Sequence, residues 1–137
     1  MLCINSMADK STLSRAFNTH LLEFLDDIIR IYPDNQDIAK AKTSIETIKK
    51  ANPALIIKAW YQKVYMPYQS VVDSGDISFF FEKDYSQDLQ SVNNAGEIMK
   101  MIDKLREPVR GMNDSNKEHC MTYIQNLSKL SMAYSAA

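Results

Sequence analysis

A helix start at Asn52-Pro53, set between two segments with helical periodicity, constrains the fold of this chain more than any other feature. An asparagine before a helix accepts a backbone N–H that the first turn leaves unpaired, and a proline there lacks the N–H that would be wasted. The apolar residues that follow repeat at helical spacing: Leu55, Ile56, Ala59, Trp60 and Val64. The segment is therefore predicted to be a helix, which Pro67 breaks or kinks because its ring clashes with the preceding turn.

Two helices are expected before this start. The first begins at Ser11 or Thr12 and ends before Pro33. Its apolar residues keep the three-and-four spacing of one buried face: Phe17, Leu21, Phe24, Leu25, Ile28 and Tyr32. The second begins near Asn35 and reaches Lys50, with cations in its last turn as the helix dipole favours.

Further helical segments are expected after Pro67. Helical character resumes through residues 69–73 and ends at Gly75, a predicted C-cap. Periodicity in residues 77–81 fits either a short helix or a strand, and a helical turn is favoured because a lone strand has no partner. A helix over residues 95–106 is closed by Pro108 and Gly111. The last helix begins at a predicted capping box formed by Ser115 and Glu118.

These elements predict an all-α fold, a compact single-domain bundle of five or six helices over residues 11–137, after a loose lead-in over residues 1–10. A chain of 137 residues is long enough to bury a core without disulfides or metals. Two cysteines give neither a disulfide framework nor a zinc site, and favour a reduced, intracellular compartment. No apolar run approaches the roughly 18–20 residues of a membrane span, so no membrane association is expected.

Catalytic and metal-binding constellations are not evident, so we expect a non-enzymatic chain without a cofactor or metal. His20, Glu23 and Asp27 share one helical face, as their spacing requires. A metal site built on helices needs further ligands converging from other helices. The favoured interpretation is therefore a solvated acidic face. His119 beside Glu118 is a weaker signal, since sequence neighbours diverge on a helix.

Lysines are concentrated between residues 40 and 63, with six of them against one acid, Glu46. Together with Trp60 and Tyr61, such an edge can contact phosphates and stack bases. The segment has no arginine and the chain has a net charge of −1, which favours a solvated face over a reader of base edges. Nucleic-acid binding is thus the alternative function. Its candidate residues are Lys42, Lys49, Lys50, Lys58 and Lys63.

Aromatic residues gather between positions 60 and 85. Most are expected in the core, but three consecutive phenylalanines cannot all face inward on one element. At least one is expected to emerge as a protein contact. The candidate partner-binding residues are Tyr68, Phe79, Phe80, Phe81 and Tyr85. Methionines, including Met112, Met121 and Met132, are expected to fill gaps in the core.

The chain carries a set of sequence blocks between residues 17 and 134: FNTHLLEFL at 17–25, YPDN at 32–35, KKANP at 49–53, GDISFF at 75–80, KDY at 83–85, KLREP at 104–108 and YIQNL at 123–127. In these blocks it resembles uncharacterised small helical proteins of nucleocytoplasmic large double-stranded DNA viruses. The resemblance implies a viral origin and a location in the infected-cell cytoplasm or the virion, with no activity to transfer. The leading hypothesis is a non-enzymatic protein-interaction or assembly component, whose partner is a viral protein or a second copy of the chain.

Overall fold

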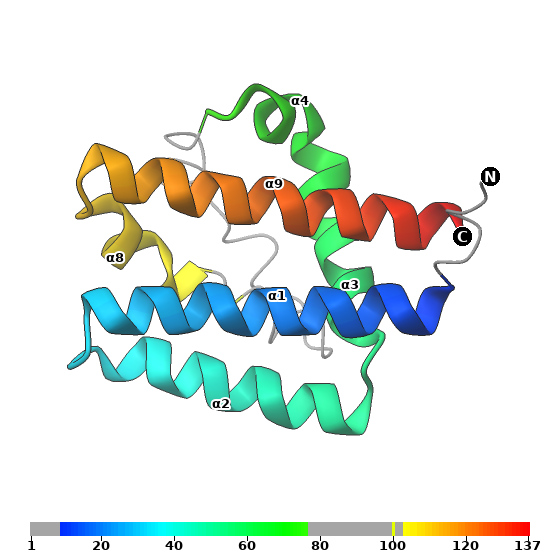
Figure 1. Ribbon diagram of the computed structural model, residues 1–137, viewed down its shortest axis with the longest axis horizontal. Helices are drawn as coiled ribbons and strands as arrows, with labels where there is room; N and C mark the ends of the chain where they lie inside the picture. The colour runs from blue at the N-terminus through cyan, green and yellow to red at the C-terminus, as the bar shows by residue number, and fades with distance from the viewer. Residues whose placement is uncertain (1–8, 77–99, 101–102) are drawn as a thin grey trace.

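The computed structural model describes residues 9–76, 100 and 103–137, and every element within these ranges is helical (Figure 1). The elements are α1 (Lys10–Ile31), α2 (Gln36–Ala51), α3 (Leu55–Trp60), the π-helix η2 (Tyr61–Tyr65), α4 (Met66–Ser74), α8 (Arg106–Arg110) and α9 (Asp114–Ala136). The all-α prediction is confirmed. The helical turn expected at 77–81 and most of the helix expected at 95–106 lie outside the described residues.

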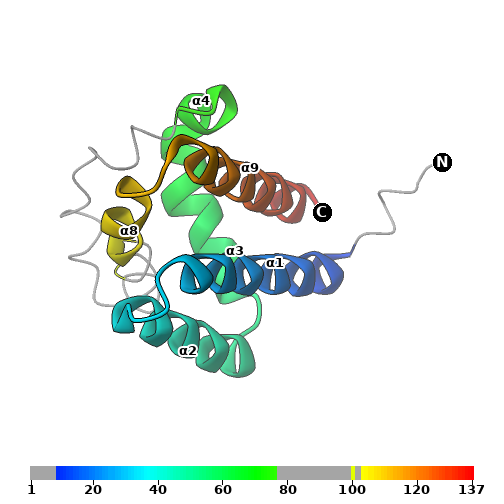
Figure 2. The same cartoon turned by 60° about the vertical axis from the view of Figure 1, so that its left-hand side comes forward.

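The two long helices, α1 with 22 residues and α9 with 23, lie side by side and run in opposite directions (Figure 1). Helix α2 packs along the other side of α1. The α3–η2–α4 segment crosses these helices at a steep angle, and α3 contacts both α1 and α9 (Figure 2). The N-terminal end of α1 is therefore beside the C-terminal end of α9.

The core lies where α1, α3 and α9 meet. Phe17 is fully buried and contacts Trp60 edge-on, with ring centroids 5.8 Å apart. The indole N–H of Trp60 donates a 3.0 Å hydrogen bond to the buried hydroxyl of Ser128. Asn18, also buried, donates to the backbone carbonyl of Pro53 at 2.9 Å. The apolar stripe predicted for the first helix is confirmed as the α1 face of this core.

The helix starts expected at Ser11 or Thr12 and at Asn52 are wrong in detail. Helix α1 is capped by Asp9, whose carboxylate accepts the Thr12 N–H at 2.8 Å. Asn52 caps the end of α2 instead of opening α3, since its own N–H donates to the Ile48 carbonyl at 2.7 Å. A turn then intervenes before α3 begins without a side-chain cap.

The capping box expected at Ser115 and Glu118 is also not formed. Asn113 precedes α9 in extended conformation, and its side chain accepts the Asn116 N–H at 2.8 Å. Ser115 is thereby already inside the helix. Both Asn113 and Ser115 are residue types that favour the N-cap position, and Asn113 occupies it.

The disruption predicted at Pro67 is confirmed, and it takes the form of a π-helix followed by a kink. Proline removes a donor and its ring crowds the carbonyl four residues earlier. The helix widens just before it, so that the N–H of Met66 donates to the carbonyl of Tyr61, five residues back. Tyr68 then leaves the helical region with φ −124° and ψ 27°. Helix α4 ends at Gly75, which has φ 77° and is the predicted C-cap.

The expectation that Pro108 closes a helix is wrong. Helix α8 includes it at its third position, where a missing N–H costs little because no earlier turn of α8 is available to pair with it. Gly111 does end α8, and its N–H donates to the Glu107 carbonyl at 3.2 Å.

Candidate functional site

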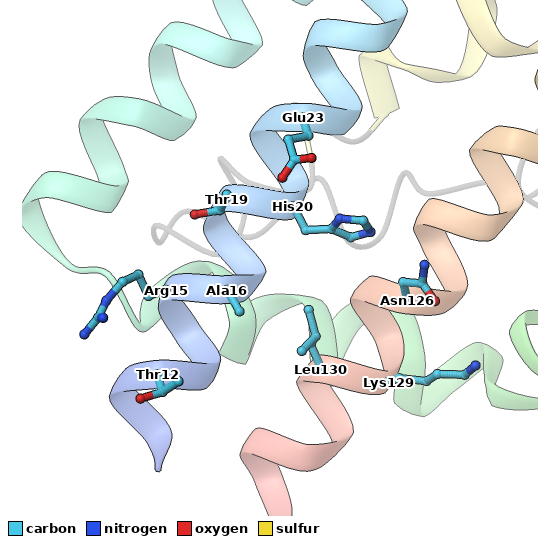
Figure 3. A pocket seen from close by; sticks show the side chains of 9 residues that line it. All are labelled: Thr12, Arg15, Ala16, Thr19, His20, Glu23, Asn126, Lys129 and Leu130. Carbon is cyan, nitrogen blue, oxygen red and sulfur yellow. The ribbon is translucent and has the colours of Figure 1, made fainter. Parts of the chain in front are cut away.

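A groove with a volume of about 680 Å³ runs along the seam between α1 and α9 (Figure 3). We call it the α1–α9 groove. Its volume falls within the range of about 300–1,000 Å³ that is typical of ligand sites. Nine residues line it: Thr12, Arg15, Ala16, Thr19, His20, Glu23, Asn126, Lys129 and Leu130.

The helical repeat of α1 and α9 places these residues together. On α1 they form two adjacent rows with steps of four positions, 12/16/20 and 15/19/23, next to the buried stripe of Phe17 and Leu21. On α9, Asn126 and Leu130 are four positions apart and flank the buried residues of that helix. The groove is therefore the outer border of the α1–α9 packing interface.

Small and apolar side chains form the floor of the groove. Ala16, His20 and Leu130 point into the space between the two helices (Figure 3). Leu130 and His20 are half-buried. The His20 Nε2 atom is buried and has no hydrogen-bond partner among the described residues. The floor is thus mainly apolar, and the buried Nε2 of His20 lies beneath its surface.

The rim of the groove carries separated charges. Arg15 and Lys129 extend to opposite sides of it, and Glu23 lies toward one end (Figure 3). Neither Arg15 nor Lys129 forms an ion pair with any residue in the described ranges. Lys129 is therefore available to a ligand, and so is Arg15, whose charge also acts on the nearby Asp9 carboxylate.

An aromatic cluster around Tyr123 adjoins the groove through His20, which lines it. The Tyr123 ring stacks on Phe24 at 4.9 Å and contacts His20 at 4.7 Å and His119 at 5.1 Å between centroids. Its hydroxyl donates a 2.6 Å hydrogen bond to Asp27, across the interface from α9 to α1. His119 Nε2 lies 3.3 Å from the same carboxylate oxygen.

The pKa values of Asp27 and Tyr123 in this cluster, and of Cys120 nearby, are shifted away from neutral pH. The hydrogen bond from Tyr123, with smaller contributions from His119 and Arg30, lowers the pKa of Asp27. Burial and the Asp27 carboxylate raise the pKa of Tyr123 to about 12. Burial, with a smaller effect of Asp27, raises the pKa of Cys120 to about 11. At neutral pH the carboxylate stays charged and the phenol and thiol stay protonated.

The solvated acidic face predicted for His20, Glu23 and Asp27 is only partly correct. Glu23 is exposed, but the Asp27 side chain is 25% exposed and hydrogen-bonded to Tyr123. The error arises because helical spacing says nothing of the neighbouring helix. The groove was also missed, although one signal pointed to it: from residue 10 to 22, and again from residue 120 to 137, the only charged residues are cations.

The candidate lysines are not gathered into one free patch. Lys42 forms an ion pair of 2.6 Å with Asp26 of α1, and this hydrogen bond raises its pKa. Lys49 and Lys63 are half-buried, while Lys50 and Lys58 are exposed. The five residues are distributed over α2, α3 and η2.

Of the five candidate partner-binding aromatic residues, only Tyr68 lies within the described ranges. Tyr68 is half-buried and packs against the core at the kink in α4. Phe79, Phe80, Phe81 and Tyr85 lie outside the described residues.

The methionines divide between core and surface. Met112 and Met121 are buried as predicted. Met132 is 44% exposed, so its assignment to the core is wrong. Met132 lies on a solvent-facing side of α9, where its sulfur is 3.7 Å from the hydroxyl of Tyr65.

Neither a metal cluster nor a membrane span is found in the described part of the chain. No group of three or more His, Cys, Asp or Glu side chains there is placed to hold a metal ion. None of the helices in those ranges combines the length and apolar character needed to cross a membrane.

Comparison of the chain with protein-family models, with curated proteins and with solved structures gives no match. Its function is therefore inferred from its own residues and their arrangement.

Proposed function

We propose that this chain is a non-enzymatic protein-interaction component and that the α1–α9 groove is where its partner binds. The observation that carries the proposal is the groove itself, a solvent-open depression of about 680 Å³ with an apolar floor and a charged rim. Protein partners commonly bind such surfaces through an apolar anchor in the centre and polar contacts at the edge.

The chemistry of the Tyr123 cluster supports a binding role over a catalytic one. A general acid or base works best with a pKa near the working pH. The pKa of Asp27 is lowered, while those of Tyr123 and Cys120 are raised to about 12 and about 11. None of these three groups is poised for proton transfer near neutral pH, and the Tyr123–Asp27 hydrogen bond joins the two long helices.

The biological setting of the proposal comes from sequence resemblance alone. On its resemblance to proteins of nucleocytoplasmic large DNA viruses, the chain would act in the infected cell or the virion, in assembly or as a structural component. Its partner would then be a viral protein or a second copy of the chain.

Site-specific photocrosslinking in cells that express the chain tests the proposal. A photoreactive amino acid is placed at Thr19, which lines the groove, and in a matched variant at Thr47, an exposed threonine on α2. We expect a discrete protein adduct from position 19 and none from position 47. Adducts of equal yield at both positions, or none from position 19, would refute the groove as the partner site.

The nucleic-acid alternative is less well supported, because the ion pair with Asp26 offsets the charge of Lys42. Solution mass measured with titrated DNA and RNA at low and moderate salt tests it. Binding through lysine–phosphate contacts weakens steeply with salt. A salt-sensitive complex that is lost on charge reversal at Lys50 and Lys58 would favour this alternative.

A further inference from the structure

The charges around the α1–α9 groove are polarised along its length. At the end where α1 begins and α9 ends, the cations are Lys10, Arg15 and Lys129, and α9 has no acid after Glu118. Lys10 lies over the ring of Tyr134 on α9, with its Nζ 5.1 Å from the centroid, so this cation is held at the seam. Asp9, the cap of α1, is the only acid close by in the sequence.

The opposite end of the groove carries the one acid among its lining residues. Glu23 lines it, whereas the carboxylate of Asp27, one turn farther along α1, is ion-paired with Arg30, which offsets its charge. Glu118 of α9 is toward the same end because the two helices are antiparallel, but it lines a different pocket, together with Gly75 and Lys117. The groups that face this end from either helix also include Arg30, His119 and the neutral Tyr123. An occupant thus meets positive charge at one end and negative charge at the other.

An α-helix has the electrostatic pattern that matches this polarity. Its N-terminus carries a partial positive charge and its C-terminus a partial negative charge, each about half an elementary charge. A helix in the groove is therefore favoured with its N-terminus at Glu23 and its C-terminus between Arg15 and Lys129. In that orientation it runs antiparallel to α1 and parallel to α9. Acidic side chains in its last turn would add charge-assisted contacts to the two cations.

The dimensions of the groove fit a short helix. From Thr12 to Glu23, α1 rises by about 16 Å, which corresponds to roughly three helical turns. Ala16 occupies the middle of this length, where a larger side chain would fill the seam. A neighbouring helix can seat apolar side chains at intervals of three and four residues against Ala16 and Leu130, as in helix-in-groove recognition.

From this charge complementarity and geometry, we infer that the α1–α9 groove binds a partner's amphipathic helix of about three turns, with its acidic C-terminal turn between Arg15 and Lys129. The inference rests on the proposed function and adds to it the chemistry and the direction of the bound segment.

Selection from two displayed pools of 14-residue stapled helical peptides tests this inference. Both pools have randomised apolar residues along one face, and they differ only in whether two glutamates occupy the last turn or the first. With the full chain as bait, we expect the pool with glutamates in the last turn to be enriched at least tenfold over the other. The charge-reversed variant R15E/K129E should lose or invert this preference.

Matched variants keep the result interpretable. The double variant K40E/K58E makes the same charge change at exposed positions on α2 and α3, and it should keep the preference. Ala16→Tyr should block enrichment of either pool, while Ala39→Tyr, at an exposed alanine on α2, should not. Circular dichroism of each variant confirms that the helices are retained.

Three outcomes of the selection would overturn the inference: no enrichment, equal enrichment of the two pools, or enrichment that R15E/K129E leaves unchanged. The proposed function fails separately. If the partner crosslinked from Thr19 carries no such helix, the inference is wrong but the proposed function is retained. If no adduct forms from Thr19, the proposed function itself is refuted. A crosslink to a second copy of the chain, together with a dimeric mass in solution, would overturn the inference and show that the groove serves self-association.

Discussion

Trp60 of α3 and Ser128 of α9 share a 3.0 Å hydrogen bond between two buried side chains, 68 positions apart in the sequence. The indole N–H has no access to water, and the serine hydroxyl is its acceptor. The bond therefore fixes the crossing segment against α9 at the centre of the core.

Replacing Ser128 with alanine should lower the free energy of unfolding by about 1–3 kcal/mol, because the buried indole N–H is left without an acceptor. Urea unfolding followed by circular dichroism measures the change. Ser135→Ala, at an exposed position of the same helix, is the control and should stay within about 0.5 kcal/mol of the unmodified chain. Equal stability of the two variants would show that the hydrogen bond contributes nothing.

Cys120 should react slowly with thiol reagents in the folded protein. Its pKa is raised from 9.0 to about 11, mainly by burial. At pH 8 a shift of two units reduces the thiolate fraction by about 100-fold, and the thiolate is the reactive species. In a Cys3→Ser variant, which isolates Cys120, the rate of reaction with a disulfide reagent should be at least about 100-fold lower than in guanidinium-unfolded protein. Similar rates in the folded and unfolded states would contradict the burial and the pKa shift together.

Tyr123 should titrate near pH 12 in the folded protein. The value is raised from 10.0 by burial and by the Asp27 carboxylate. NMR titration of protein labelled at the tyrosine ring carbons measures it, and the resonance missing from a Tyr123→Phe variant identifies it. Asp27→Asn should move the midpoint back toward 10, since it removes the negative charge that disfavours the phenolate. An unchanged midpoint in Asp27→Asn would show that the charge of Asp27 does not raise the pKa of Tyr123.

The same shift has a stability consequence at alkaline pH. Because the folded pKa is the higher one, the unfolded state loses this proton first as pH rises. The contribution of Tyr123 is therefore fully present below pH 10.0 and is lost between pH 10.0 and about 12. The stability difference between the unmodified chain and Tyr123→Phe should narrow across this window and be constant between pH 7 and 9.

What the sequence predicts well is local. The stripe that contains Phe17 and Leu21 repeats within one helix, so its burial could be predicted without knowing what covers it. Helix ends were harder, since Asn113 and Ser115 both suit a cap and only the approach of the chain decides between them. The Asp27–Tyr123 bond and the α1–α9 groove depend on how α1 and α9 are aligned, which periodicity does not specify.

Gly75 ends α4 in a conformation that disfavours any other residue. Its φ of 77° is in the left-handed region, and a Cβ there would lie 3.4 Å from Nε2 of Gln125, whose amide donates to the Val72 carbonyl at 3.0 Å. Gly75→Ala should therefore cost about 1–2 kcal/mol of unfolding free energy, mostly from the backbone. Gly75→Asn should cost less, because asparagine adopts this region more readily. Gly111→Ala is the matched control: its Cβ would meet Tyr32 at the same 3.4 Å, but with φ −79° there is no backbone penalty. If urea unfolding shows equal costs for the two alanine variants, the contact and not the left-handed backbone sets the requirement for glycine at position 75.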